Sequence, residues 1–219
     1  MLHVFVETNW VVAYAAPAHH RVQIPAAADL LDRAAAGELT LHLPSICISE
    51  ARRPLHYDFQ VQATADRVRQ FLLWARDEQH VTVEEDEITR RALDKMEGFV
   101  KRDLGRLEET LTSLQQKPGL NIFDITQEIA ERCTELSFKS LGLKPFDQMI
   151  LSAVLVRSKD LHDSGETDLA FCSLDADLQP WDRLRNPKAL LKSLYDNARV
   201  WVYGDFLLQA PGKPEGWPG

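Results

Sequence analysis

Short apolar segments typical of β-strands alternate along this chain with longer segments of helical character. The strand candidates are Leu2–Val6, LTLHLP at 39–44, HVTVE at 80–84, DLAFCS at 168–173 and RVWVYG at 199–204. Parallel strands need a long crossover between them, which is usually a helix. The alternation therefore predicts an α/β fold with a mainly parallel sheet.

The segments between the strand candidates carry helix start and stop signals. Ser45 is a candidate N-cap, Pro145 suits a first helical position, and Gly37 and Gly142 suit helix ends. The predicted helices are IPAAADLLDRAAAGEL at 24–39, SICISEARRPL at 45–55 ending at Pro54, a segment from Val61 to Ala75, ITQEIAERCTELSFKSLG at 125–142 and KPFDQMILSAVLVRS at 144–158.

A charged stretch at about 85–119 has apolar residues at three- and four-residue spacing from Leu93 to Leu114. This spacing predicts one long amphipathic helix or a helical hairpin that ends before Pro118. We expect residues 1–210 to form a single domain with this helical insertion, and 211–219 to form a flexible Pro/Gly-rich tail. The apolar stripe can pack on its own domain, on a second copy of the chain as a homodimer, or on another partner. The sequence alone does not distinguish among these three packing alternatives.

Composition narrows the class of protein. The 219 residues are 45% hydrophobic, which is enough for a sizeable core. No apolar run approaches the roughly 20 residues that span a bilayer, and there is no signal-peptide pattern, so no membrane association is expected. Cys47, Cys133 and Cys172 are scattered and form no CxxC motif. They predict reduced thiols and a cytoplasmic location.

The chain is acidic, with a formal net charge of −8. This charge argues against a protein that coats nucleic acid without sequence preference. It is compatible with an enzyme whose carboxylates hold a metal ion against a phosphodiester. The sequence lacks the GxxxxGK[ST] and GxGxxG motifs, so nucleotide-driven and dinucleotide chemistry have no support.

Acidic residues occur where an α/β fold places its ligands, beyond the carboxyl ends of the strands. They come from four separate parts of the chain. The acids are Glu7 after the first strand, Glu50 on the helix after the second, Asp147 in the first turn of a helix, and Asp175 and Asp177 after a late strand. If these carboxylates converge, their repulsion requires a cation, and hard ions such as Mg²⁺ or Mn²⁺ prefer oxygen ligands.

The order and context of these acids resemble the PIN domain family, whose members are metal-dependent nucleases. Members begin with a strand that ends in Asp-Thr-Asn, matched here by Glu7-Thr8-Asn9. The second and third family acids are matched by Glu50 in SICISEA and by Asp147 in PFDQMILSAV. The last family motif, Thr/Ser-x-Asp-x-Asp after a strand, is matched by Ser173, Asp175 and Asp177 in FCSLDADL. The resemblance covers most of the chain except 85–119 and the tail. Two features depart from it: the first acid is Glu instead of Asp, and the chain is longer than the compact toxin ribonucleases.

The resemblance implies a Rossmann-like three-layer α/β/α fold and a Mg²⁺- or Mn²⁺-dependent endoribonuclease acting on single-stranded RNA. It also implies that the chain is a toxin with an antitoxin protein as its partner. The metal ligands would be Glu7, Asp147 and Asp175, with help from Glu50 and Asp177. Asn9 and Ser173 would orient carboxylates through hydrogen bonds. Arg52 and Arg53 are candidates for steering RNA electrostatically.

Other interpretations of the same residues remain open. Each acid taken alone is compatible with a solvated strand end, helix start or turn. The Glu at position 7 keeps open a PIN-like RNA- or protein-binding module without catalysis. A phosphatase similar to the haloacid dehalogenase family would place its Asp-x-Asp nucleophile directly after the first strand, whereas Asp175-Ala176-Asp177 comes late.

Overall fold

The computed structural model describes residues 1–15, 24–58 and 61–209. The chain divides into two compact units. The first, which we call the sheet unit, comprises Met1–Ala51 and Ser113–Gly219, and the second, the hairpin unit, comprises Arg52–Thr112. The predicted tail at 211–219 lies outside the described residues.

A five-stranded, all-parallel sheet forms the centre of the sheet unit. Its strand order is β3-β2-β1-β4-β5. The strands are β1 (Leu2–Val6), β2 (Leu39–Pro44), β3 (Leu120–Phe123), β4 (Leu169–Cys172) and β5 (Val200–Tyr203). The predicted parallel α/β fold is confirmed.

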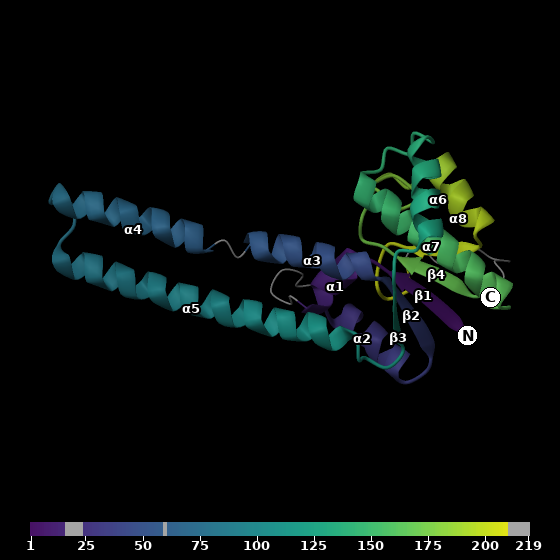
Figure 1. The fold of residues 1–219 in the computed structure, drawn as a ribbon, viewed down its shortest axis with the longest axis horizontal. Helices are drawn as coiled ribbons and strands as arrows, with labels where there is room; N and C mark the ends of the chain where they lie inside the picture. The colour runs from purple at the N-terminus through teal and green to yellow at the C-terminus, as the bar shows by residue number, and fades with distance from the viewer. Residues whose placement is uncertain (16–23, 59–60, 210–219) are drawn as a thin grey trace. The chain divides into compact units, whose positions relative to one another are not determined.

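Helices cover both faces of this sheet. They are α1 (Thr8–Ala15), α2 (Ile24–Ala35), α6 (Gln127–Ser137), α7 (Pro145–Asp163) and α8 (Ala189–Asn197). Crossovers between parallel strands are right-handed, so connections that run in opposite directions along the sheet lie on opposite faces. Accordingly α1 and α2 lie on one face and α6, α7 and α8 on the other (Figure 1). This arrangement is the predicted three-layer architecture.

The direction of strand addition reverses between β1 and β4. From β1 the chain adds β2 and then β3 on one side, and it later adds β4 and β5 on the other. In open α/β sheets, ligands bind beside such a reversal, at the carboxyl ends of the two central strands. Glu7 follows β1 and Ser173 follows β4, so both lie at this point.

Gly119 allows the chain to enter β3 close to α2. Its φ angle is +75°, and a Cβ atom there would lie 2.2 Å from the carbonyl oxygen of Ala34. The Gly119 carbonyl accepts a hydrogen bond of 2.9 Å from the backbone N–H of Leu41 in β2. Only glycine combines this backbone conformation with such a close approach.

The strand predicted at HVTVE is wrong, because α5 (Val83–Leu114) begins within it. Thr82 and Glu85 form a capping box: Glu85 Oε2 accepts from the Thr82 N–H and hydroxyl at 2.8 Å, and the Glu85 N–H donates to Thr82 Oγ1 at 3.3 Å. This cap starts a helix where alternation alone favours a strand. The strand that follows β2 in the sheet is β3, which the sequence analysis missed.

Several predicted helix ends also differ from the structure; α7, for example, continues past the predicted end at Ser158 to Asp163. Helix α3 (Ser45–Asp58) continues past Pro54, because the proline penalty of roughly 3 kcal/mol is finite and the rest of a 14-residue helix can outweigh it. Helix α6 ends at Ser137, before Gly142. Its last buried residue is Leu136, and Phe138 is 82% exposed, so further turns would bury little.

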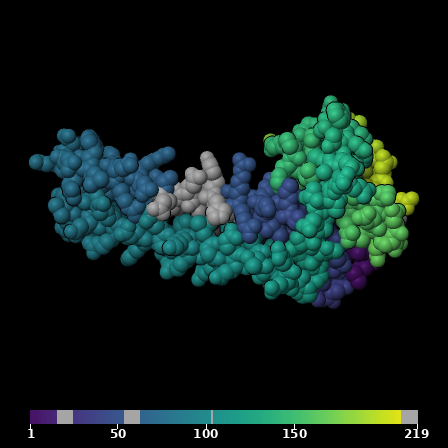
Figure 2. Space-filling model, in the orientation of Figure 1, coloured from purple at the N-terminus to yellow at the C-terminus, as the bar shows by residue number. Residues whose placement is uncertain are grey.

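The hairpin unit contains α4 (Val61–Asp77) and most of α5, which meet side by side (Figures 1 and 2). Ala65 and Leu72 of α4 pack with Leu93 of α5, and Val68 and Val81 border this small core. The charged stretch is therefore mostly one long helix, as one of the two sequence alternatives predicted.

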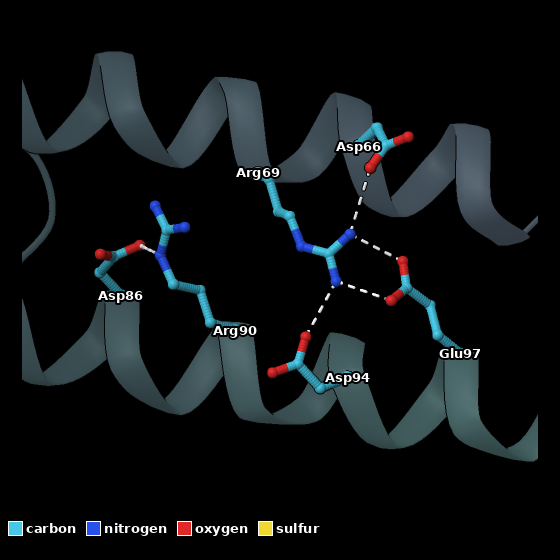
Figure 3. Close-up of polar contacts among 6 residues, drawn as sticks. All are labelled: Asp66, Arg69, Asp86, Arg90, Asp94 and Glu97. Atoms are coloured by element: carbon cyan, nitrogen blue, oxygen red, sulfur yellow. Dashed lines mark hydrogen bonds and ion pairs between the residues drawn. The ribbon is translucent and has the colours of Figure 1, made fainter.

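Ion pairs reinforce one side of the hairpin (Figure 3). Arg69 forms a bidentate pair with Glu97 at 2.7 and 2.8 Å, and it also contacts Asp66 and Asp94. Arg90 donates to the buried Asp86 at 2.8 Å. None of the helices in the described part of the chain has the length and apolar composition needed to cross a membrane.

Candidate metal centre

Glu7 lies at the carboxyl end of β1 and is 2% exposed. Its Oε2 accepts a hydrogen bond of 2.8 Å from the backbone N–H of Asn9. Its Oε1 accepts one of 3.3 Å from the hydroxyl of Ser173, directly after β4. The side chain therefore links the ends of the two strands that flank the topological reversal.

Burial is the main influence on the ionisation of Glu7. It raises the pKa of the carboxyl group from 4.5 to about 7, and the nearby charge of Asp175 acts in the same direction. The hydrogen bonds from Asn9 and from the backbone of Leu174 oppose the rise. Near neutral pH this carboxylate is thus poised to ionise, and a bound cation would favour its charged form.

The Asp-x-Asp segment after β4 forms a tight loop anchored on Ser173. The backbone N–H of Asp175 donates to Ser173 Oγ at 3.1 Å, and the N–H of Asp177 donates to Asp175 Oδ1 at 2.8 Å. The Gln179 amide donates to the Ser173 carbonyl at 2.8 Å. Asp175 is half-buried, whereas Asp177 is exposed and lies 3.8 Å from Lys144 Nζ. Asp175 is the better placed of the two acids to act together with Glu7 and Asp147.

Asp147 lies in the first turn of α7 and is 7% exposed. Burial raises its pKa, as do the charges of Asp175 and Asp177, while Lys144 lowers it. Its Oδ2 atom is buried and has no hydrogen-bond partner among the described residues. An unsatisfied buried carboxylate oxygen is unfavourable, and a cation would relieve it.

Glu50, on α3, is half-buried and accepts a hydrogen bond from the Thr8 hydroxyl. Cys47, on the same helix, is a buried thiol whose pKa is raised first by burial and then by the charges of Glu7 and Glu50, while hydrogen bonds with Thr8 lower it. Neither Thr8 nor Cys47 was among the predicted site residues. Thr8 was visible within the Glu-Thr-Asn motif, but its contact with Glu50 is a tertiary feature.

The structure brings four predicted acids into electrostatic contact: Asp175 acts on both Glu7 and Asp147, and Asp177 also acts on Asp147. However, across residues 1–15, 24–58 and 61–209, no three His, Cys, Asp or Glu side chains are grouped so as to hold a metal ion. The donor set is chemically suited to Mg²⁺ or Mn²⁺, because it consists of carboxylate oxygens and includes the unpaired Asp147 Oδ2. Its side chains would have to close further around such an ion.

The two arginines predicted to steer RNA belong to the hairpin unit. Arg52 Nε donates to both carboxylate oxygens of Glu108, at 3.1 and 3.0 Å. A phosphate would have to compete with this ion pair. Arg53 is exposed, and its role stays a prediction.

The three cysteines are free thiols.

Comparison of the chain with known protein families, with curated proteins and with solved structures finds no match.

Proposed function

We propose that this chain is a Mg²⁺- or Mn²⁺-dependent endoribonuclease of PIN type. The proposal depends on one observation. Glu7, Asp147 and Asp175 come from distant parts of the sequence, yet the charge of Asp175 contributes to the raised pKa of both Glu7 and Asp147. Mutually repelling, largely buried carboxylates at a topological reversal are what a site for a hard cation and a phosphodiester requires.

These side chains have separate roles in this proposal. Glu7, Asp147 and Asp175 would hold the ion, with help from Glu50 and Asp177. Such an ion would supply activation of water and neutralisation of charge on the phosphate. Ser173 and the Asn9 N–H orient Glu7, and Thr8 orients Glu50. The substrate is RNA in the cytoplasm, Arg53 helps to attract it, and an antitoxin protein would restrain the activity.

The test is cleavage of a labelled single-stranded RNA by the purified chain with Mn²⁺. Chelation by EDTA should abolish cleavage, and Asp147→Asn should slow it by at least about 100-fold, as expected when a charge-stabilising group is lost. Asp163→Asn is a matched control, because Asp163 is exposed at the other end of the same helix. Cleavage at the normal rate by Asp147→Asn would remove this residue from the chemistry.

The second candidate is a PIN-like RNA- or protein-binding module without catalysis. It is favoured by the hydrogen bonds that tie Glu7 to Ser173 and Asn9 and by the lack of a preformed ligand group among the described residues. Calorimetric titration with Mn²⁺ separates the two candidates. Absence of heat at millimolar Mn²⁺, with the fold intact by circular dichroism, would favour the binding module.

A further inference from the structure

We propose that a small aromatic cavity near the Asp-x-Asp loop binds a pyrimidine base of single-stranded RNA. The cavity has a volume of about 150 Å³ and lies in the sheet unit, between β5, α8 and the segment that follows the Asp-x-Asp loop. Its lining residues that carry rings are Pro180, Trp181, Pro187, Tyr195 and Trp201. The inference rests on the proposed function for its choice of RNA, but it does not require catalysis.

The volume of the cavity suits a single six-membered ring. An apolar protein cavity of about 150 Å³ is large enough to bind benzene. A pyrimidine base has one such ring, whereas a purine has two fused rings. Trp181 and Trp201 line the cavity and are both half-buried, and unstacked RNA bases bind by stacking on aromatic side chains. Size and wall chemistry together therefore favour a pyrimidine.

The wall that carries Trp181 is held in place by its own backbone. Trp181 and Pro187 form an isolated antiparallel bridge. The backbone N–H of Lys188 donates a hydrogen bond of 2.9 Å to the carbonyl of Pro180, which closes the segment between them. A cavity formed before binding spares the ligand the cost of ordering its wall.

The charged residues of the lining favour a base over an apolar side chain. They are Arg185, Lys192 and Asp196. Lys192 pairs with Asp196, whereas Arg185 has no ion pair with any residue that the structure describes and lies 5.2 Å from the centre of the Trp181 ring. A pyrimidine has carbonyl or imine acceptors for the Arg185 and Lys192 donors and N–H groups for the Asp196 carboxylate. A phenylalanine ring would use none of these groups.

The segment around the cavity is basic, although the chain as a whole is acidic. Between residues 180 and 202 the sequence has five basic and two acidic residues, an excess of three positive charges in a chain of net charge −8. The basic residues are Arg183, Arg185, Lys188, Lys192 and Arg199, and the acidic residues are Asp182 and Asp196. The Asp182 carboxylate already accepts hydrogen bonds from the N–H groups of Leu184 and Asn186. Such a local excess attracts the phosphates on either side of a bound base.

Hydrogen bonds connect the cavity to the loop that carries Asp175. The hydroxyl of Tyr195 donates to the carbonyl of Leu178 at 2.9 Å, and the Leu178 N–H donates to the carbonyl of Asp175 at 3.1 Å. The charge of Glu7, after burial, contributes to the raised pKa of Tyr195, so the wall of the cavity lies within electrostatic range of the candidate metal centre. An RNA strand with a base in the cavity would therefore pass close to that centre.

Fluorescence anisotropy of labelled pentauridylate with the full chain in EDTA tests the cavity. We expect Trp181→Ala to weaken binding by about tenfold or more, as for the loss of one base–aromatic stack. Trp74→Ala is a matched control, because Trp74 is 52% exposed and belongs to the hairpin unit, and it should change binding by less than about twofold. Circular dichroism checks that each variant is folded.

Two further comparisons test the base and the charge. Pentaadenylate should bind the natural chain at least about threefold more weakly than pentauridylate, and Trp181→Ala should remove this preference. Arg185→Gln should weaken binding of pentauridylate by about threefold or more. Arg183→Gln removes the same charge from the same exposed segment but outside the lining, so its effect should be smaller.

The outcomes separate this proposal from the proposed nuclease, because EDTA removes the metal from the binding assay. Binding that Trp181→Ala leaves unchanged, or equal affinities for the two oligonucleotides, would overturn the cavity even if the chain cleaves RNA with Mn²⁺. Trp181-dependent binding without cleavage would support the cavity and count against the nuclease. Failure to bind pentauridylate, with Trp181-dependent binding of an acidic peptide that contains phenylalanine, would assign the cavity to a protein partner instead.

Discussion

At the scale of single residues, Glu7 couples the stability of the fold to pH. Its pKa is 4.5 as an ordinary carboxyl and about 7 in the folded chain. Between these values the folded state holds a proton that the unfolded state has lost. The free energy of unfolding therefore falls as pH rises from about 4.5 to 7, by roughly 3 kcal/mol in total, and stays low above that range.

Replacing Glu7 with glutamine should remove the fall in unfolding free energy that ionisation of Glu7 causes. We expect Glu7→Gln to be more stable than the natural chain by roughly 2–3 kcal/mol at about pH 8, and similar to it at about pH 4. Urea unfolding at both pH values measures the difference. The exposed Glu109→Gln serves as a control and should show no such effect. Equal stabilities of Glu7→Gln and the natural chain at pH 8 would mean that Glu7 is solvated.

His42 has the opposite influence. Burial, followed by the charges of His3 and Arg157, lowers the pKa of its imidazole from 6.5 to about 3. Below pH 6.5 the unfolded state binds a proton at His42 that the folded state does not bind. The free energy of unfolding therefore falls as pH falls toward 3. Over the shared range, the effects of Glu7 and His42 partly cancel.

Removing the Glu7 carboxyl group should therefore expose the full effect of His42 on the pH dependence of stability. We expect the stability of Glu7→Gln to fall more steeply between about pH 6.5 and 4 than that of the natural chain. Adding His42→Leu should flatten this dependence, although the variant also loses the 2.9 Å hydrogen bond between His42 and His3. The slope of unfolding free energy against pH is the measurement, and an unchanged slope in the double variant would contradict the assignment.

At the scale of elements, Gly119 controls how β3 joins the sheet. Gly119→Ala should destabilise the chain by about 3 kcal/mol or more, because a Cβ atom meets the backbone of Ala34 and the φ angle is positive. Gly37→Ala isolates the cost of the backbone conformation, since φ is +78° there but no atom of the described residues lies within 4 Å of the added Cβ. It should cost about 1 kcal/mol. Thermal unfolding of both variants tests this, and equal losses would exclude the clash.

The boundaries of helices and strands show where the local sequence was sufficient to predict the structure. Gly37 and Pro145 lie close to the helix ends they predicted, because backbone geometry alone favours them there. Alternating residues at 80–84 suggested a strand, but the Thr82–Glu85 cap determines the helix. The T-x-x-E pattern was a usable signal in the sequence. By contrast, β3 is only four residues long and half-buried, so its apolar pattern is weak.

At the scale of the whole molecule, the proposed metal site should link stability to Mn²⁺. A ligand at about 100 times its dissociation constant stabilises the fold by about 2.7 kcal/mol. We expect Mn²⁺ to raise the melting temperature of the natural chain and to have little effect on Asp147→Asn. Asp163→Asn should respond like the natural chain. Equal stabilisation of all three would place Mn²⁺ elsewhere on this acidic surface.

The sequence by itself determined most strands and helices and the position of each acid relative to them. These properties depend on near neighbours: apolar spacing, caps and turn residues. Only the tertiary structure decided that β1 and β4 are adjacent, that Ser173 reaches Glu7, and that one buried oxygen of Asp147 finds no partner among the residues the structure describes. Strand order and desolvation arise from contacts between residues far apart in the chain. For that reason Glu7 could be identified as a candidate ligand from its motif, but its raised pKa could not.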